Sequence, residues 1–367
     1  MTVPPFDVFR NRSVLVTGHT GFKGSWLSLW LNSLDARVAG YSLPAPTSPS
    51  NFGVSRVHDV IHNHFEEDVR DLDALSKAVN TTDPEVVFHL AAQPIVLESY
   101  RNPVETAAIN ILGTVHLLDA IRRRGRPCCV IIVTSDKCYG LRDQPWGHRE
   151  DEPLGGEDPY SASKAAAEII AASYRRSYFD PANLGDHGVR LATVRAGNVI
   201  GGGDWAPNRI VPDVIRALES GETVKVRNPA AIRPWQHVVE PLGGYLTLAS
   251  EMLSAADGGL CTSWNFGPAR HDEGSVGDVV EAFLQSWGSG SWTTCVDQSA
   301  PRESTVLRLA TNRATARLGW RPLWDLSETV HRTARWYRRH ADAPHQSMRE
   351  ECLTDITDYQ DARQRTQ

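Results

Sequence analysis

Short apolar runs alternate with helical patterns along roughly the first two hundred residues, and this alternation constrains the fold more than any other feature. Runs such as "SVLVTG" (13–18) and "RVAGYS" (37–42) have the length of buried strands. Between them, "GSWLSLWLNSLD" (24–35) repeats apolar residues at spacings of three and four, as an amphipathic helix does. Strands and helices in alternation form right-handed crossovers, so the pattern predicts an α/β fold with a doubly wound parallel sheet covered on both faces.

The pattern changes after residue 201, where loops, a helix and short strands indicate a second, smaller unit. We expect a nucleotide-binding domain in residues 1–200, with returning segments near 236–267. The smaller α/β domain, which would bind the substrate, is expected in residues 201–235 and 268–340. The remaining residues, 341–367, are expected to be a polar C-terminal tail without a strong pattern.

Composition limits the classes of partner. The 367 residues carry a formal net charge of -6 and have a pI near 6.1, which argues against a nucleic-acid-binding protein. There is no run of about 18 apolar residues and no apolar leader at the N-terminus, so we expect neither a membrane span nor a signal peptide. The six cysteines lack CxxC pairs and the histidines do not cluster, which predicts reduced thiols, a cytoplasmic location and no metal site.

The stretch "VTGHTGFKG" follows the first expected strand and opens the first expected helix, with Gly18, Gly21 and Gly24 in the spacing G-x-x-G-x-x-G. Such glycines let the backbone approach a pyrophosphate, and a helix N-terminus offers free N–H groups, so the turn predicts a Rossmann-type dinucleotide site. The acid that usually ends the second strand is missing in "VAGYSLPAP". Asp68 in "EEDVRD" either meets the adenine edge or caps the helix that starts near Leu72.

A second group of reactive side chains follows the strand expected at "VIIV". There, "TSDKCYG" places Ser135, Asp136 and Lys137 in succession, which by itself is also typical of a solvated loop. Further along, "PYSASK" places Tyr160 and Lys164 four residues apart, on one face of a helix. An ammonium group beside a phenol lowers the pKa of the phenol and can bind a ribose, so the tyrosine can act as acid or base near neutral pH.

In their order and spacing, these motifs resemble the extended short-chain dehydrogenase/reductase superfamily. The motifs are "TGHTGFKG", "DVRD", "HLAAQ", "NILGT", "VTSDKCYG", "PYSASK" and "VRAGNVIGGGDW". Within it, "EPLGGEDPYSASK", "GGGDWAPNR" and "RPWQHVVEPLGGYL" are most similar to the CDP-glucose 4,6-dehydratases, and the resemblance covers about residues 10–340. It implies that NAD is bound by Gly18, His19, Thr20, Gly21, Phe22, Lys23, Gly24, Asp68, Val69, Leu90, Ala91, Ala92, Tyr160 and Lys164.

The resemblance implies an NAD-dependent lyase that regenerates its own cofactor. Tyr160 would remove the proton of the sugar O4 while C4 gives a hydride to NAD, assisted by Lys164 and the hydroxyl of Ser135. The resulting 4-keto group acidifies C5, water leaves across C5–C6, and the hydride returns to C6. The expected substrate is CDP-D-glucose, and the product a 4-keto-6-deoxy sugar nucleotide.

The neighbours Asp136 and Lys137 would carry out the elimination. Related dTDP-glucose dehydratases have Asp-Glu here, whereas the CDP-glucose branch has lysine in the second position, as this chain does. Asp136 is the candidate acid, which requires a carboxyl kept protonated by a dry pocket. Lys137 is either the base at C5, which requires a depressed pKa, or a charged group that stabilises the enolate. The sequence leaves this choice open.

The substrate side is expected in "AAQ", "GNVIGGGDWAPNR", "RPWQH" and "APRES", where arginines suit a diphosphate because the guanidinium binds phosphate oxygens in a bidentate way. Leu97 and Glu98 stand where the family has basic residues, and "PRESTVLRLATN" lacks the usual histidines and aspartate. These departures bear on the nucleotide and the sugar, not on the type of reaction. The candidate substrate-binding residues are Gln93, Asn198, Trp205, Asn208, Arg209, Arg233, His237 and Arg302.

Other enzymes on this scaffold are the alternatives: a dTDP-, UDP- or GDP-sugar 4,6-dehydratase, a 5,6-dehydratase or a 4-epimerase. An epimerase needs no acid–base pair after the strand, so Asp136 and Lys137 argue against it. A non-catalytic NAD-binding scaffold would not need the serine, the tyrosine and the second lysine. Relatives often pair through two long helices, here expected at 103–124 and 160–178, so we expect a homodimer or homotetramer.

Overall fold

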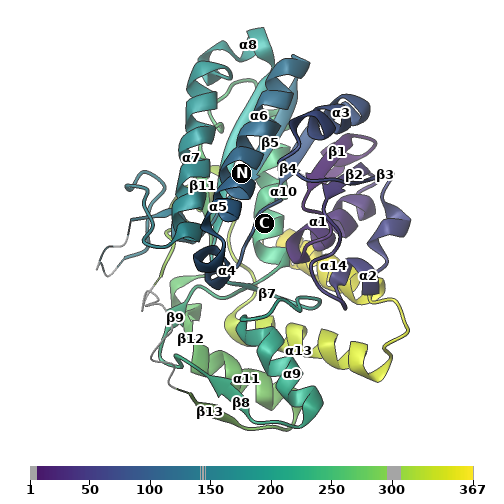
Figure 1. The fold of residues 1–367 in the computed structure, drawn as a ribbon, viewed down its shortest axis with the longest axis vertical. Helices are drawn as coiled ribbons and strands as arrows, with labels where there is room; N and C mark the ends of the chain where they lie inside the picture. Colours follow the sequence, from purple (N-terminus) through teal and green to yellow (C-terminus); the bar gives the residue numbers. More distant parts are fainter. Residues whose placement is uncertain (1–5, 141, 143, 145, 296–306, 367) are drawn as a thin grey trace.

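A seven-stranded parallel sheet forms the centre of the molecule (Figure 1). The structure, a computed structural model, describes residues 6–140, 142, 144, 146–295 and 307–366. The strand order β11-β6-β5-β4-β1-β2-β3 confirms the predicted doubly wound α/β fold. The strands of this sheet are β1 Ser13–Thr17, β2 Arg37–Ser42, β3 Asn63–Glu66, β4 Val86–His89, β5 Cys128–Val133, β6 Val189–Ala196 and β11 Ser263–Phe266.

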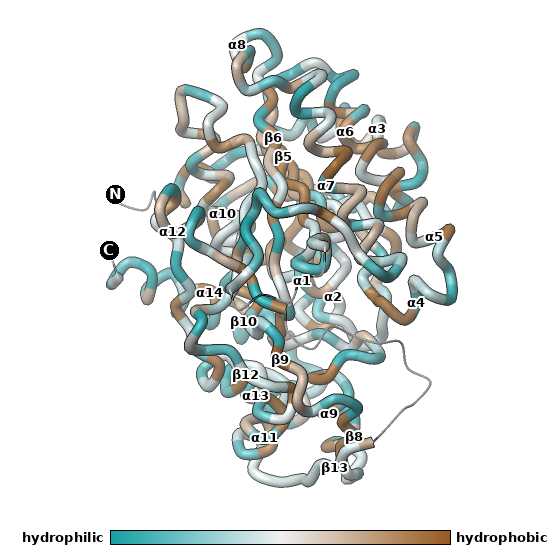
Figure 2. Tube along the Cα trace, turned by 90° about the vertical axis from the view of Figure 1, so that its left-hand side faces the viewer, coloured by the Kyte–Doolittle hydropathy of each residue, from teal (hydrophilic) through white to brown (hydrophobic). Residues whose placement is uncertain are grey.

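Alternate residues of the central strands face different hydrophobic clusters. In β5, Ile131 and Val133 belong to one cluster of buried residues, whereas Val130 and Ile132 belong to another. Successive side chains of a strand point to opposite faces, so a strand that is apolar throughout must be covered on both. All residues of β5 are buried. Figure 2 shows hydrophobic segments at β5 and β6 in the interior of the molecule. This burial explains why the strands read as unbroken apolar runs in the sequence.

Helices cover both faces of this sheet. Their bounds are α1 Phe22–Ser33, α2 Asn51–Val54, α3 Leu72–Thr82, α4 Val96–Arg101, α5 Pro103–Ala107, α6 Gly113–Arg124, α7 Pro159–Ser177, α8 Leu184–His187 and α10 Val239–Ser254. On one face, α3, α6 and α7 bury Leu75, Leu117 and Ala171. On the other face, α1 and α10 bury Trp30 and Leu246. Because strands and covering helices alternate along the chain, the carboxyl ends of the strands all meet at one edge of the sheet.

A smaller part of the molecule lies below this edge in Figure 1. Among the described residues, three two-stranded pairs occur outside the central sheet, β7 with β10, β9 with β12 and β8 with β13. Helix α9 packs against β8 of the last pair, α11 packs against α9 and β12, and α13 packs against α11 and β10. The bounds are β7 Val199–Ile200, β8 Val224–Val226, β9 Ile232–Arg233, β10 Gln236–His237, β12 Gly274–Ser275, β13 Trp292–Thr294, α9 Ile210–Ser220, α11 Val276–Trp287, α12 Asn312–Leu318 and α13 Leu326–Asp342.

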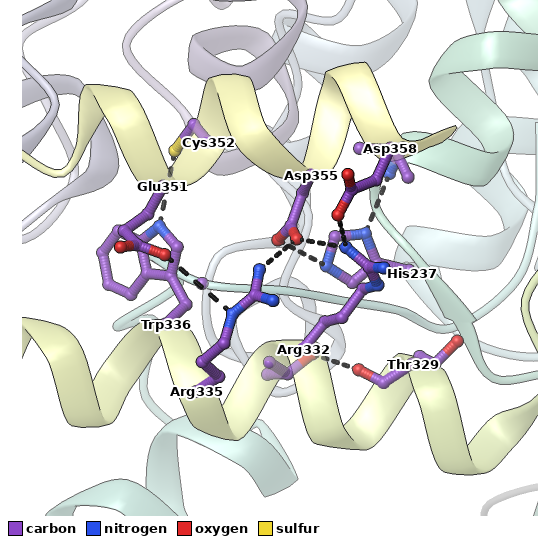
Figure 3. Close-up of polar contacts among 12 residues, drawn as sticks. His237, Thr329, Arg332, Arg335, Trp336, Glu351, Cys352, Asp355 and Asp358 are labelled. Carbon is purple, nitrogen blue, oxygen red and sulfur yellow. Dashed lines mark hydrogen bonds and ion pairs between the residues drawn. The ribbon is translucent and has the colours of Figure 1, made fainter. Parts of the chain in front are cut away.

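The C-terminal tail differs from the expectation of a segment without pattern, because most of it forms helix α14 (Arg349–Arg365). This helix packs against α1 and α10 and buries Ile356. Asp355 is also buried, and its Oδ1 accepts hydrogen bonds from Arg332 (2.8 Å) and Arg335 (2.5 Å) of α13 (Figure 3). The sequence did not reveal α14 because charged and polar residues far outnumber the apolar ones along it. Its buried stripe consists of only Cys352, Ile356 and Tyr359, together with Asp355.

One stretch of the described chain, Pro103–Arg124, is long and apolar enough to cross a membrane by length and composition. It comprises α5, the π-helical segment Ala108–Leu112 and α6. Of its apolar 18-residue stretch, 44% is buried inside the molecule. A helix in the core of a soluble protein can have the same length and composition, so these two properties are weak evidence for a membrane span. Its outward face exposes Val104 and Leu112.

Candidate active site

The turn between β1 and α1 brings the backbone against the end of β4. Gly18 has a φ of +75°, and a Cβ at this position would lie 2.7 Å from the nitrogen of Ala91. A Cβ at Gly24 would lie 2.1 Å from the oxygen of Gly18, so both positions require glycine. Within the described chain, no side chain caps α1 at Gly21. The first N–H groups of α1 therefore lack a side-chain acceptor and suit a phosphate.

The residues that follow β4 lie beside this turn. Leu90 donates its N–H to the carbonyl of Thr17 (3.0 Å), and Ala91 donates to the Thr17 hydroxyl (3.3 Å). Ala92 is partly exposed. The ring of Phe22, at the start of α1, faces the glycine loop that follows β7. The structure thus brings the predicted "LAA" segment to the glycine turn.

Two other residues of the turn direct their side chains into the protein. His19 is fully buried, and its Nε2 lies 2.7 Å from Nδ1 of His64. Burial, with the neighbouring His64, lowers the pKa of His19 to about 3. The hydroxyl of Thr20 hydrogen-bonds with that of Ser42 (2.8 Å). These contacts tie the turn to the region of β2 and β3, so the structure does not support a side-chain contact between either residue and a cofactor.

Asp68 does not cap the helix that follows it. The N-cap of α3 is Asp71, whose carboxylate accepts from the N–H of Ala74 (2.9 Å). The Asp68 carboxylate instead accepts from Nε of Arg70 (2.9 Å), and this hydrogen bond lowers the pKa of Asp68. Val69 is buried. The capping role of Asp68 is therefore wrong, whereas its contact with adenine remains a prediction.

The strand end after β5 turns at once into a 3₁₀ helix, η4 (Asp136–Cys138). Ser135 caps this helix: its hydroxyl accepts from the N–H of Lys137 (3.2 Å) and donates to Oδ1 of Asp136 (3.0 Å). Asp136 is 3% exposed, and among the described residues its Oδ2 has no hydrogen-bond partner. Burial raises the pKa of Asp136, so the site suits a carboxyl group that holds a proton.

Helix α7 carries the predicted tyrosine and lysine to this strand end. Its N-cap Asp158 accepts a backbone N–H of the first turn (2.9 Å), which fixes where the helix begins. Burial raises the pKa of Tyr160 to about 12, and a hydrogen bond with Ser135 opposes this shift. Burial lowers the pKa of Lys164 to about 8, and its Nζ donates to the carbonyl of Val133 (3.3 Å). The structure thus unites the two predicted catalytic motifs.

Lys23 has a role at this edge that its position in the glycine turn did not reveal. Burial and the charge of Arg209 lower the pKa of Lys23 to about 8, while the charge of Asp136 raises it. The charges of Lys137, Lys23 and Arg233 all act on the Asp136 carboxyl. Cations from η4, α1 and β9 therefore surround one buried acid.

The loop that follows β7 contributes an arginine. Nη1 of Arg209 lies 2.8 Å from Oδ2 of Asp204, and the arginine side chain is 33% exposed. Asn208 is exposed and has a φ of +64°. Trp205 is buried, with its ring edge-on to Tyr337 of α13 at 5.5 Å between centroids. The indole therefore anchors the loop on α13, which leaves Arg209 and Asn208 as the predicted residues that can meet a ligand.

His237 lies in the core. It has no exposed surface, and its ring packs edge-on to Trp26 (5.7 Å) and Trp324 (5.0 Å). Its Nε2 is 3.8 Å from Oδ2 of Asp355 in the network of α13 and α14 (Figure 3). Burial lowers its pKa to about 3. A ligand would have no surface of His237 to touch, so the structure does not support the predicted substrate contact.

Four predicted substrate residues remain. Arg233 is buried, and its Nη1 donates to the carbonyl of Ile232 (3.0 Å). The Nε2 of Gln93 donates to the hydroxyl of Thr106 (2.9 Å), which turns this side chain toward α5. Asn198 precedes β7, and its carbonyl accepts from the N–H of Gln236 (3.1 Å). Arg302 lies outside the described residues. Across the part of the chain that the structure describes, no group of three His, Cys, Asp or Glu side chains could hold a metal ion.

A buried ion pair beneath α7 was not singled out from the sequence. Glu168 and Arg195 are each 3% exposed, with Oε2 and Nη2 separated by 2.8 Å. The one available signal was the position of Glu168, four residues after Lys164 and therefore on the same face of the helix.

A glycine-rich turn suited to a dinucleotide, a Ser-Asp-Lys strand end and a Tyr–Lys helix meet at one sheet edge, which is the arrangement of the short-chain dehydrogenase/reductase class. A family model described as GDP-mannose 4,6 dehydratase matches residues 15–333. The chain belongs to this family of nucleotide-sugar 4,6-dehydratases.

Two relatives within the family differ in how similar they are to this chain. CDP-glucose 4,6-dehydratase of Salmonella typhimurium is 46% identical over 332 residues, which cover 90% of this chain and 92% of the relative. dTDP-glucose 4,6-dehydratase of Streptomyces griseus is 29% identical over 343 residues, which cover 89% of this chain and 94% of the relative.

Solved structures share the fold. The dTDP-glucose 4,6-dehydratase DesIV of Streptomyces venezuelae, with NAD and TYD bound, superposes with a TM-score of 0.74 at 24% identity, covering 91% of this chain and 99% of that one. The Bacillus anthracis dTDP-glucose 4,6-dehydratase in complex with NAD gives a TM-score of 0.73 at 20% identity, covering 90% and 97%.

Proposed function

We propose that this protein is an NAD-dependent hydro-lyase that converts CDP-D-glucose to its 4-keto-6-deoxy derivative. The observation that carries the proposal is the edge after β5, where Asp136 and its neighbour Lys137 lie beside the tyrosine and lysine of α7. An epimerase needs the tyrosine and lysine but no acid–base pair for the loss of water. The 46% identity with the Salmonella CDP-glucose 4,6-dehydratase favours CDP-glucose among the nucleotide sugars.

The glycine turn fits a dinucleotide. The turn has no room for a Cβ at Gly18 or Gly24, so nothing but backbone lies between a pyrophosphate and the N-terminus of α1 at these positions. Bound NAD would supply a reversible hydride acceptor at the sugar C4. We assign Lys164 to the nicotinamide ribose and Asp68 to the adenosine end of this cofactor.

Tyr160 and Ser135 act in the redox step. The phenolate of Tyr160 takes the O4 proton, so that the carbonyl forms at C4 as its hydrogen departs as hydride. Burial raises the pKa of the phenol to about 12, which by itself makes it a weak acid. The hydrogen bond between Tyr160 and Ser135 and the charge of Arg209 both lower the pKa of the phenol, and so favour the phenolate that acts as the base.

Asp136 and Lys137 act in the elimination. The 4-keto group acidifies the C5 proton, which the Lys137 amine accepts, and the electron pair of the C5–H bond moves into the enolate. The protonated carboxyl of Asp136 then gives its proton to the C6 hydroxyl, and water leaves as the C5–C6 double bond forms. Burial of Asp136 favours the protonated form that this step requires.

The two parts of the molecule have separate tasks in this proposal. Residues 1–200, with 236–267, form the cofactor-binding domain, because β11 joins the central sheet beside β6. Residues 201–235 and 268–340 form the domain that holds the nucleotide. Arg209 is the principal diphosphate ligand in this assignment because its guanidinium is partly exposed.

We further propose that two copies pair through α5, α6 and α7 as a homodimer, in the cytoplasm. Val104 of α5, Ile169 of α7 and Leu112 of the π-helical segment that joins α5 to α6 are exposed, and apolar side chains gathered on adjoining helices indicate a contact surface. All six cysteines are unpaired, as thiols of a reducing compartment are.

Incubation with CDP-, dTDP-, UDP- and GDP-glucose tests the substrate assignment. We expect a 4-keto product, seen as ultraviolet absorbance in base and as the loss of water by mass spectrometry, with CDP-glucose turned over fastest. Product from another nucleotide at a higher kcat/KM would contradict the CDP assignment, and an epimerised hexose without loss of water would contradict the dehydratase.

Tyr160→Phe tests the assigned base. Loss of a positioned general base typically lowers turnover by roughly 10²–10⁴-fold. Tyr174→Phe, a change of the same chemistry further along α7, is the matched control and should leave kcat unchanged. If Tyr160→Phe retained the parent turnover, the catalytic assignment would be wrong.

A further inference from the structure

Helix α7 carries three polar side chains at a spacing of four residues: Tyr160, Lys164 and Glu168. Residues at this spacing lie on one face of a helix, one turn apart. The first two are the assigned catalytic pair, and all three are buried. The third residue has no part in the reaction as proposed above, although it shares the catalytic face.

Glu168 connects α7 with the ends of two strands. Its Oε1 accepts from the hydroxyl of Thr134 (2.6 Å) and from Nε of Arg195 (3.0 Å). Its Oε2 accepts from the hydroxyl of Thr193 (2.7 Å) and from Nη2 of Arg195 (2.8 Å). Thr134 directly precedes Ser135, so one carboxylate fixes the catalytic helix relative to the catalytic strand end.

Arg195 extends the same network past η4. Its Nη1 donates to the hydroxyl of Tyr139 (2.7 Å) and to the carbonyl of Glu150 (3.1 Å). The Tyr139 hydroxyl in turn donates to Oδ1 of Asn265 on β11 (2.7 Å). The segment that bears Asp136 is therefore held on both sides, by Thr134 before it and by Tyr139 after it.

The hydrogen bonds of Glu168 exclude an acid–base role for this residue. Each carboxylate oxygen already accepts two hydrogen bonds, and the residue is 3% exposed, so a substrate cannot reach it. Burial raises the pKa of Glu168, but the charge of Arg195 and the hydrogen bonds from Arg195, Thr134 and Thr193 outweigh it, so the pKa is lowered. Glu168 is therefore a fixed negative charge beneath the site.

Several titratable groups face the Lys164 amine from the elements packed around it. Tyr160 and Glu168 lie on its own helix. The other elements contribute Cys138 of η4, His89 of β4 and Lys23 of α1. Burial keeps Cys138 and His89 uncharged, since it raises the pKa of the thiol and lowers that of the imidazole.

We propose that Glu168 is a positioning residue, which fixes the catalytic helix to the ends of β5 and β6 and places a negative charge one helical turn from the Lys164 amine. The proposal rests on the assigned roles of Tyr160 and Lys164. With the carboxylate present, Lys164 keeps its proton to a higher pH than it would without it. Lys164 then stays charged through neutral pH. In this form it binds the ribose and stabilises the phenolate.

The pH dependence of kcat in Glu168→Gln tests this proposal. Loss of the charge lowers the pKa of Lys164, so the alkaline fall in kcat should move to lower pH by about one unit. Thr193→Val removes one hydrogen bond to the same carboxylate but leaves its charge, so the fall should stay at the parent pH. Competitive acetylation of Lys164 across the same pH range, read by mass spectrometry, should show the same shift independently of turnover.

Glu168→Gln leaves the buried Arg195 without its counter-charge, which can prevent folding. The double variant Glu168→Gln with Arg195→Met removes both charges and avoids this cost. The charge of Glu168, but not that of Arg195, acts appreciably on Lys164, so the double variant should show the same alkaline shift.

The proposal would be overturned if either variant lost kcat equally at every pH and kept the parent pH dependence of kcat and of Lys164 acetylation. Glu168 would then have a purely structural role. Failure of the proposed catalytic roles has a different signature, because it appears as undiminished turnover in Tyr160→Phe.

Discussion

An acid that gives up a proton in catalysis must first be able to hold it, and at the scale of single residues the surroundings of Asp136 favour its protonated form. One carboxylate oxygen accepts from Ser135, while the other has no partner among the described residues. Removal from water raises the pKa of this carboxyl, and nearby cations lower it. The net effect is a raised pKa, which favours the protonated form of this carboxyl. Its neighbour Lys137 is partly exposed and can therefore reach a bound sugar.

Lys137→Ala distinguishes a base from a fixed charge. If the amine takes the C5 proton, turnover should fall by roughly 10²–10⁴-fold and added primary amines should restore part of it. The measurement is kcat at increasing concentrations of a small amine, at constant ionic strength. Lys225→Ala, an exposed lysine of β8, is the matched control. Equal rescue by an inorganic salt would instead assign Lys137 to charge stabilisation of the enolate.

At the scale of elements, α10 holds a second buried acid, Glu240, close to the start of the helix. Its Oε1 accepts the backbone N–H groups of Leu323 (2.8 Å) and Trp324 (2.7 Å). Burial raises the pKa of Glu240 to about 8. The carboxyl thereby fixes the chain that leads from α12 into α13, and it does so mainly in its neutral form below that pH.

Glu240 makes stability depend on pH. Its folded-state pKa, about 8, lies above the unfolded value of 4.5, so the folded state binds more protons across this interval. The free energy of unfolding must therefore fall as pH rises from 4.5 to 8, by about 3–5 kcal/mol from this group alone. Urea unfolding near pH 5 and pH 8 measures the fall, which Glu240→Gln should largely remove. An equal fall in parent and variant would show that Glu240 does not cause it, and Glu281→Gln, exposed on α11, is the control.

The arrangement of elements was predictable from the sequence because it follows from local patterns. Alternating apolar runs and helical periodicity specify a parallel sheet, and in such a sheet residues that end neighbouring strands meet at one edge. Ser135 and Tyr160 could therefore be assigned to one site from motifs alone. Side-chain direction could not be assigned in this way. His19 and His237 belong to matching motifs, yet tertiary packing turns both into the core.

The partners of buried charged residues could not be predicted from the sequence either. Glu168 pairs with Arg195 across 27 positions of sequence, and each residue alone reads as an ordinary charge on a helix or a strand. The contribution of Lys23 to the Asp136 site depends on how α1 packs near η4, which a turn motif does not encode. The place of α14 was hidden in part for the same reason, because the ion pairs of its Asp355 with α13 join residues far apart in sequence.

At the scale of the whole molecule, the C-terminal helices connect the two parts of the chain. α14 packs on α1 and α10 of the larger part, and Asp355 binds the arginines of α13 in the smaller part (Figure 3). α13 in turn holds the substrate loop, because Tyr337 donates its hydroxyl to the carbonyl of Asp204, and Asp204 pairs with Arg209. A continuous set of contacts thus runs from the C-terminus to the assigned diphosphate ligand.

Asp355→Ala should weaken this connection strongly. The residue is 1% exposed, and its loss leaves Arg332, 12% exposed, without a buried partner, so the free energy of unfolding should drop by about 3 kcal/mol. Asp358→Ala is the matched control, because Asp358 binds the same arginine at 43% exposure and should cost under about 1 kcal/mol. Urea unfolding of both variants checks this, and equal losses would contradict a special role for the buried acid.

In the proposed reaction, one site oxidises C4, removes water and returns the same hydrogen to C6. Incubation of CDP-[4-²H]glucose with the enzyme in ordinary water follows this hydrogen. We expect a 4-keto-6-deoxy product that carries the deuterium in its C6 methyl group, seen by mass spectrometry and NMR. Deuterium that remains at C4 of an unchanged or epimerised hexose, or that is lost to solvent, would contradict it.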